Sequence, residues 1–153
     1  MQKKTGEIFE FDSYKLELFC EETRTQYASL PGEMSGDVGS RMFRYHLPRA
    51  SREAMELLQK MGIDPSKLHL ARPLSEPDEK GEVLFLCAAR LCGRLLAGGR
   101  EIPRRSVEAA GMSLVFVDDR RQFREGLMPF PDPELELRFV IPLPFDTKFF
   151  DLF

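Results

Sequence analysis

The longest stretch with a single coherent pattern of hydrophobic and polar positions covers residues 75–99. At helical spacing its apolar residues fall on one broad side, which favours a buried helix over residues 75–97. Ser75 is placed to cap this helix, and a glycine pair follows its end. Gly81 weakens the prediction, because glycine inside a helix costs about 0.5–1 kcal/mol relative to alanine. The alternative is a strand that begins at Glu82, but the helix is the preferred prediction.

The beginning of the chain has the period of two that is typical of strands. Residues 7–11 and 14–20 alternate between apolar and polar positions on either side of Asp12 and Ser13, which predicts a β-hairpin. Residues 23–28 are rich in β-forming side chains and predict a third strand. Residues 31–40 carry three glycines and little apolar surface, which predicts a loop.

Two more strands are predicted on either side of an amphipathic helix. Residues 41–47 and residues 67–71 alternate, and His69 is expected to point outward from the second of these strands. Between them, residues 51–61 carry an apolar stripe at helical spacing, with Ser51 as the N-cap and a glycine just after the end.

The last third of the chain predicts the remaining strands. Residues 112–117 are apolar without interruption, which is typical of a strand buried on both faces near the centre of a sheet. Residues 118–126 are charged and predict a surface turn. Residues 134–141 alternate cleanly, with one apolar face formed by Leu135, Leu137, Phe139 and Ile141.

Together these elements predict a single α+β domain over residues 1–153. An antiparallel or mixed sheet of about five to seven strands packs one face against the helices at 51–61 and 75–97. Residues 142–153 are expected to form an aromatic C-terminal tail, held extended by Pro142 and Pro144.

Composition narrows the class of protein. Hydrophobic residues make up 42% of the chain and charged residues 31%, which is ordinary for a soluble globular protein. The first residues lack the apolar run of a signal peptide, and no apolar run approaches the length of a membrane-spanning helix, so a cytoplasmic protein is expected. The net charge of −3 comes from alternating acidic and basic segments. This pattern favours internal charge pairing and makes nucleic acid an unexpected partner.

Candidate chemistry is sparse. Cys20, Cys87 and Cys92 are odd in number and lack metal-ligand spacing, so we expect three small buried hydrophobic side chains, no metal and no cofactor. His46 and His69 lie in no motif with a nucleophile or a metal ligand, and no residue is assigned a catalytic role.

Two charged turns could still bind a ligand. One loop combines two glycines with arginines, a composition able to hold a phosphate or carboxylate, and its candidate residues are Gly98, Gly99, Arg100, Arg104 and Arg105. The other places Asp118 and Asp119 at a strand end, where carboxylates often meet metals or substrates. Neighbouring arginines that neutralise the two aspartates are the simpler interpretation.

The tail concentrates large apolar side chains, with candidate partner-binding residues Phe145, Phe149, Phe150, Leu152 and Phe153. Such surface is rarely left in water. Its last four residues, from Phe150 to Phe153, resemble the Leu-Asp-Leu-Phe end of the short peptide by which many bacterial replication and repair proteins dock on the sliding clamp. Phe149 stands where that peptide usually has glutamine. The resemblance implies clamp docking; a packed tail, a tail exchanged in a homodimer and a different protein partner are the alternatives.

The sequence therefore predicts a non-enzymatic interaction or adaptor domain that binds another protein chain through its aromatic tail. A small module that binds an anion or nucleotide through the loop at 98–105 is the first alternative. An accessory protein of DNA replication or repair is the second.

Overall fold

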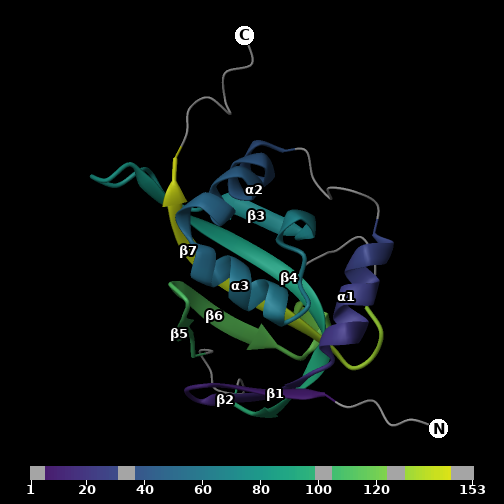
Figure 1. The fold of residues 1–153 in the computed structure, drawn as a ribbon. Coiled ribbons are helices and arrows are strands. Elements are labelled where there is room, and N and C mark those ends of the chain that lie inside the picture. Colours follow the sequence, from purple (N-terminus) through teal and green to yellow (C-terminus); the bar gives the residue numbers. More distant parts are fainter. Residues whose placement is uncertain (1–5, 31–36, 99–104, 124–129, 146–153) are drawn as a thin grey trace, which may run out of the picture.

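The computed structural model describes residues 6–30, 37–98, 105–123 and 130–145 (Figure 1). Within these residues the chain forms an α+β fold around one antiparallel sheet, as predicted. The strands are β1 (Glu7–Phe11), β2 (Tyr14–Leu18), β3 (Leu70–Pro73), β4 (Glu82–Ala97), β5 (Val107–Ala109), β6 (Met112–Val117) and β7 (Glu134–Pro144). The sheet has the order β1-β2-β4-β7-β6-β5, and β3 pairs separately with β4.

Strand β4 is the longest strand of the described sheet and pairs with three other strands. Its 16 residues pair along one side with β7, in a register that runs from Glu82 opposite Pro144 to Cys92 opposite Glu134. Along the other side, its first half pairs with β3 and its second half with β2. The predicted helix over residues 75–97 is therefore wrong, and the strand that begins at Glu82 is confirmed.

Burial on both faces explains this error. From Cys87 to Cys92 every residue of β4 except Arg90 is buried, so apolar side chains occupy odd and even positions alike. Apolar residues on both faces also satisfy a helical spacing, because the period of two is lost. Gly81, the weak point of the helix prediction, lies in the turn before β4 at a φ of +76°.

Helices α2 (Val38–Ala50) and α3 (Arg52–Lys60) cover one face of the sheet, which we call the inner face (Figure 1). The ring of Phe43 lies 6.4 Å from that of Phe85 on β4 and 6.3 Å from that of Phe139 on β7. The predicted helix at 51–61 is confirmed: the Ser51 side chain accepts a hydrogen bond from the Ala54 amide.

The strand predicted at 41–47 is wrong, because these residues lie in α2. Met42, Phe43 and Leu47 are buried together, which matches one face of a helix. The Asp37 side chain caps the helix by accepting a hydrogen bond of 2.7 Å from the Ser40 amide. The predicted loop at 31–40 thus ends in the first turn of α2, and residues 31–36 lie outside the described residues.

The strand predicted at 23–28 is also wrong, since these residues belong to α1 (Cys20–Ser29). This helix lies against the part of β4 that neither β3 nor β2 covers. The Tyr27 hydroxyl donates to the Arg90 carbonyl at 2.8 Å, and the Cys92 amide donates to the Thr23 hydroxyl oxygen at 3.0 Å. Side chains of α1 therefore satisfy backbone groups of β4 that a neighbouring strand would otherwise bind.

The opening hairpin and the strands at 112–117 and 134–141 are confirmed as β1–β2, β6 and β7. Strand β2 ends at Leu18, before the predicted residue 20, and β6 lies next to the edge strand β5 and not at the centre of the sheet. Stacked and edge-on rings hold the hairpin against β6: Phe11 and Tyr14 lie 5.9 Å and 5.3 Å from the ring of Phe116. The strand predicted at 67–71 begins later, at Leu70, after a short 3₁₀ turn (Pro65–Lys67).

Pro142 and Pro144 belong to β7 and do not start the tail, which corrects the boundary predicted at residue 142. The Phe145 amide, like those of other odd positions, points to β4 and donates to the Gly81 carbonyl. The backbone nitrogens of the two prolines, which carry no hydrogen to donate, therefore point to the opposite side. On that side β6 pairs with β7 only as far as Val140, so the prolines interrupt no pairing with β6. Among the described residues, no helix is long and apolar enough to cross a membrane.

Candidate functional site

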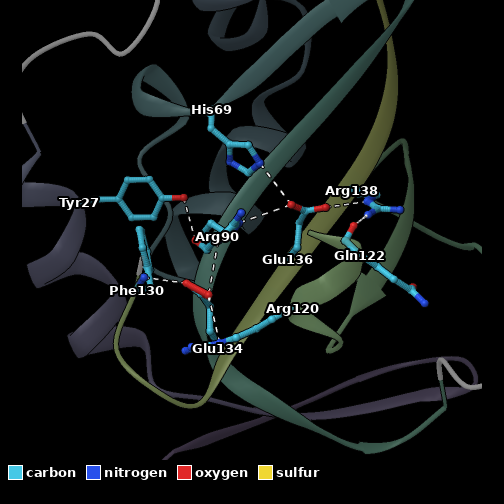
Figure 2. A network of polar contacts seen from close by, with 9 residues as sticks. All are labelled: Tyr27, His69, Arg90, Arg120, Gln122, Phe130, Glu134, Glu136 and Arg138. Atoms are coloured by element: carbon cyan, nitrogen blue, oxygen red, sulfur yellow. Dashed lines mark hydrogen bonds and ion pairs between the residues drawn. The ribbon is translucent and has the colours of Figure 1, made fainter. Parts of the chain in front are cut away.

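Ionisable side chains gather on the outer face of the sheet, opposite α2 and α3 (Figure 2). Glu134 and Glu136 are two residues apart on β7 and so point to the same face. Arg90 of β4 is paired in register with Glu136. We call this group the charged cluster, and its other members are His69, Arg120 and Arg138.

Glu136 is at the centre of the charged cluster, and its side chain is fully buried. Its Oε1 accepts a hydrogen bond of 2.6 Å from Nε of Arg138. Its Oε2 lies 3.4 Å from Nε of Arg90 and 3.3 Å from Nε2 of His69. Removing a carboxylate from water costs several kcal/mol, and here two guanidinium groups offset that cost.

Glu134 is also buried and joins three segments of the chain. Its Oε1 lies 3.4 Å from Nη1 of Arg90 and 3.7 Å from Nε of Arg120. Its Oε2 accepts a hydrogen bond of 2.6 Å from the Phe130 amide. The Glu134 carboxylate therefore holds two segments against β4: the residues that lead into β7, through Phe130, and the turn after β6, through Arg120.

The turn after β6 contains a 3₁₀ helix, η2 (Arg120–Gln122), and folds back over the charged cluster. The guanidinium carbon of Arg90 lies 4.7 Å from the ring centre of Phe123, a cation–π contact. Arg138 donates from Nη2 to the Gln122 carbonyl (Figure 2). Arginine partners of the buried carboxylates thus hold residues 120–123 of the charged surface turn predicted at 118–126, and residues 124–126 lie outside the described residues.

This geometry favours a stabilising role for the charged cluster. No exposed atom of Glu136 is left to touch a substrate, and both carboxylates face arginines. A general base needs access to the proton that it removes. The cluster therefore ties β4, β7 and η2 together without presenting an open reaction centre at Glu136.

A cleft of about 590 Å³ opens beside the charged cluster, between β4, η2 and the start of β7. Its charged lining residues are Arg94, Asp118, Arg120, Asp132 and Glu134. Arg94 pairs with Glu17 at 2.6 Å, and Arg120 pairs with Asp132. Both arginines of this lining are thus already paired with carboxylates, which does not favour the binding of an anionic ligand.

Of the two aspartates after β6, Asp119 behaves as the simpler interpretation predicted. Asp119 caps η2 and forms an ion pair with Arg121 at 3.1 Å. The hydrogen bonds that Arg121 donates to this carboxylate raise the pKa of its guanidinium. Within the described residues, no three His, Cys, Asp or Glu side chains gather as a group that could hold a metal ion.

All three cysteines are free and buried, as predicted. Burial raises the pKa of the Cys20 thiol to about 11, with a smaller contribution from the nearby negative charge of Glu7. Burial also raises the pKa of Cys87 well above its usual value. Since the thiolate is the reactive form, both side chains are poor nucleophiles near neutral pH.

The two histidines lie on different elements and have different neighbours. His46 is on α2, where its ring packs edge-on against Tyr45 at 4.9 Å. His69 does not point outward as predicted: its side chain is 6% exposed and turns toward Glu136. It precedes β3 directly, so the alternation assumed for residues 67–71 does not apply to it.

The candidate anion-binding loop is described only at its two ends. Gly98 has a φ of +88°, and a Cβ there would lie 2.4 Å from the Ser13 carbonyl oxygen. The Arg105 carbonyl accepts a hydrogen bond of 2.8 Å from the Tyr14 hydroxyl. Both ends are therefore fixed to the start of β2. Gly99, Arg100 and Arg104 lie outside the described residues.

The tail is described only at Phe145, which is partly buried against the core. Phe149, Phe150, Leu152 and Phe153 lie outside the described residues.

The part of the outer face that adjoins Phe145 carries apolar side chains. We call this area the outer apolar patch, and it consists of Leu74, Leu84, Leu86, Val140 and Pro142.

Register places these five side chains together. Leu84 is opposite Pro142, and Leu86 is opposite Val140. The Leu74 amide donates to the Leu84 carbonyl, which continues the β3–β4 pairing. Leu84 and Leu74 are 44% and 49% exposed, and they are among the few large hydrophobic residues of the described chain with so much accessible surface.

Comparison of the chain with protein-family models, with curated proteins and with solved structures finds no match in any of the three. The function must therefore be argued from the geometry. Sequence reasoning missed the charged cluster and the outer apolar patch. The available signal for the cluster was the presence of Arg90 and Glu136 inside strongly apolar segments.

Proposed function

We propose that this protein is an interaction domain that binds another protein chain through its C-terminal segment and the adjoining end of the β4–β7 pair. The observation that carries the proposal is the outer apolar patch. Most of the patch lies where the start of β4 pairs with the end of β7, and the aromatic segment 146–153 follows β7 in the sequence.

Apolar side chains grouped at one place on a surface are typical of a site that another chain covers. The outer apolar patch combines two exposed leucines with an exposed proline on one face of the sheet. The segment 146–153 adds Phe149, Phe150, Leu152 and Phe153 within a few residues of it. Aromatic residues are enriched at the centres of protein interfaces, where they supply large contact areas.

The charged cluster and its cleft offer less support for an enzyme. Their carboxylates are buried and paired with arginines, and the two thiols with raised pKa values are poor nucleophiles. Nothing described at Gly98 or Arg105 favours the anion-binding alternative over a loop with anchored ends. The clamp-docking alternative is one specific form of the proposed function, with the same segment bound to a different partner.

The test is a full-length variant in which Phe149→Ser and Phe150→Ser remove two aromatic side chains from the segment. Truncation at Ile141 would be a poor test, because it also removes Leu143, a fully buried core residue. The expected result is an unchanged thermal unfolding midpoint together with loss of association, measured as mass in solution and as proteins retained from a cell extract. If the double variant keeps its mass and every partner, the segment does not bind another chain and the proposal is wrong.

A further inference from the structure

We infer that the outer apolar patch is the receptor for the segment 146–153 of a second copy of this chain, so that two copies exchange these segments around a twofold axis. This inference rests on the proposed function and adds the identity of the partner and the surface that it occupies.

The direction of β7 is the first argument. Phe145 continues the pairing with β4 through its hydrogen bond to the Gly81 carbonyl, so the chain leaves the sheet still running away from Pro142. To reach the patch of its own chain, the segment would have to reverse within its first few residues. A second copy related by a twofold axis near Phe145 places its patch ahead of the segment, and no reversal is needed.

The length of the segment fits this arrangement. Residues 146–153 number eight, which span roughly 26–29 Å when extended. The patch extends over two successive outward positions of β4 and of β7, which is roughly 7 Å along a strand. The segment is therefore long enough to cross a twofold axis and still cover the partner's patch.

Interface area is the second argument. A stable dimer buries about 1,200–2,000 Å² in total. Five partly exposed aliphatic side chains on each copy fall short of that when patch meets patch alone. Three phenylalanines bury about 450–750 Å² per segment, and two exchanged segments together with two patches reach the range of a stable interface.

Charge is compatible with the same arrangement. Arg72 is opposite Leu86 on the outer face and is exposed at the border of the patch. The segment carries Asp146 and Asp151 among its apolar residues, against one basic residue, Lys148. Glu82, opposite Pro144 on the same face, borders the other end of the patch. Opposite charges therefore meet when the aspartates of the segment lie toward the Arg72 end, which favours that placement of the segment on the patch.

The test uses full-length chains and sedimentation over the micromolar range. Wild-type protein is expected to dimerise. Leu84→Glu, which damages the receptor, and the double variant Phe149→Ser with Phe150→Ser, which damages the segment, should each raise the dimer dissociation constant by more than about a hundredfold. Ile8→Glu is the matched control, because Ile8 is 53% exposed on β1, away from the patch, and should leave the dimer unchanged.

Mixing the two damaged chains separates exchange between copies from folding back within one chain. One intact segment and one intact receptor remain in a mixed dimer, so the mixture should associate where neither variant does alone. A mixture that stays monomeric, or a Leu84→Glu chain that dimerises like wild type, overturns the inference.

The outcomes also separate this inference from the proposed function. If the segment variant loses association while Leu84→Glu keeps it, the segment binds another surface, so the inference fails and the proposed function stands. If wild-type protein is monomeric but loses extract partners when Phe149 and Phe150 are replaced, the partner is a different protein and the inference again fails alone. If neither variant changes any association, both fail.

Discussion

Replacing the buried Glu136 with glutamine should destabilise the protein more than the same substitution at an exposed glutamate. Glutamine keeps the size and shape of the side chain but removes the negative charge between Arg90 and Arg138. Breaking a buried ion pair by neutralising one partner typically costs about 3–5 kcal/mol, because the other charge stays buried. Total stabilities of domains are about 5–15 kcal/mol, so this loss is a large fraction.

The assay is thermal and urea unfolding followed by circular dichroism. For a chain of this length, 1 kcal/mol corresponds to about 2–4 °C in the midpoint, so Glu136→Gln should lower it by roughly 6–20 °C. Glu17→Gln is the matched control, because Glu17 pairs with Arg94 on the same face but the arginine side chain is 60% exposed. Exposed pairs contribute about 0–1 kcal/mol, so the control should change the midpoint by only a few degrees.

A double-mutant cycle with Arg138→Gln locates the effect. If Glu136 and Arg138 stabilise each other, the double variant should be less destabilised than the sum of the two single variants. A Glu136→Gln protein within about 1 kcal/mol of wild type would refute the reasoning, because Glu136 could not then be the buried charge that joins β4, β7 and η2.

Three further predictions test other parts of the fold. Thr23→Val should cost about 1–3 kcal/mol, because the buried Cys92 amide loses its acceptor, while Thr23→Ser should retain most of the stability; equal losses in urea unfolding would contradict this. Gly98→Ala should destabilise more than Gly81→Ala in the same assay: both have positive φ, but only at Gly98 would a Cβ collide with a backbone oxygen, and equal effects would contradict the predicted clash. The raised pKa of Cys87 keeps its thiol protonated in the folded state above pH 9.0, where the unfolded thiol ionises. Its contribution to the free energy of unfolding is therefore complete below that pH and falls by about 1.4 kcal/mol per pH unit above it. Cys87→Ala should make this alkaline loss less steep, and an unchanged slope of the free energy of unfolding against pH would contradict the prediction.

The sequence predicted the elements whose pattern is decided locally. The helix after Ser51 was recognisable because a capping residue and an apolar stripe agree within a few turns. Strand β7 was recognisable because Leu135 and Leu137 face the core while Glu134 and Glu136 face the other way. In each case one apolar face imposes its period on the sequence.

The elements that were predicted wrongly have a pattern set by tertiary contacts. Strand β4 is buried on both faces at its centre, because α1 and the turn with Phe123 cover parts that a simple half-buried strand would expose. Helix α1 was read as a strand because its buried residues, Thr23 and Tyr27 among them, bond to the backbone of β4 and do not form an apolar stripe. Such contacts join residues about 60–70 positions apart, and no local pattern encodes them.

The candidate sites show the same division. Arg90 and Glu136 are each visible in the sequence as a charge inside an apolar strand, but their pairing depends on the register between β4 and β7. The outer apolar patch depends on the same register, which places Leu84 opposite Pro142. The β4–β7 pair thus has two parts on its outer face. In one part, buried charged side chains pair with one another, and in the other part apolar side chains remain exposed.

That arrangement is consistent with a surface built for association. A docking surface on a strand pair must keep its shape when the partner leaves, and the exposed end of β4–β7 receives little support from β6, which pairs with β7 only as far as Val140. The charged cluster lies next along the same two strands and fixes their register through Arg90 and Glu136. A slip of one residue would bury unpaired charges and turn Leu84 to the inner face, so the cost of such a slip is high. The cluster can therefore preserve the position of the patch without itself touching the partner.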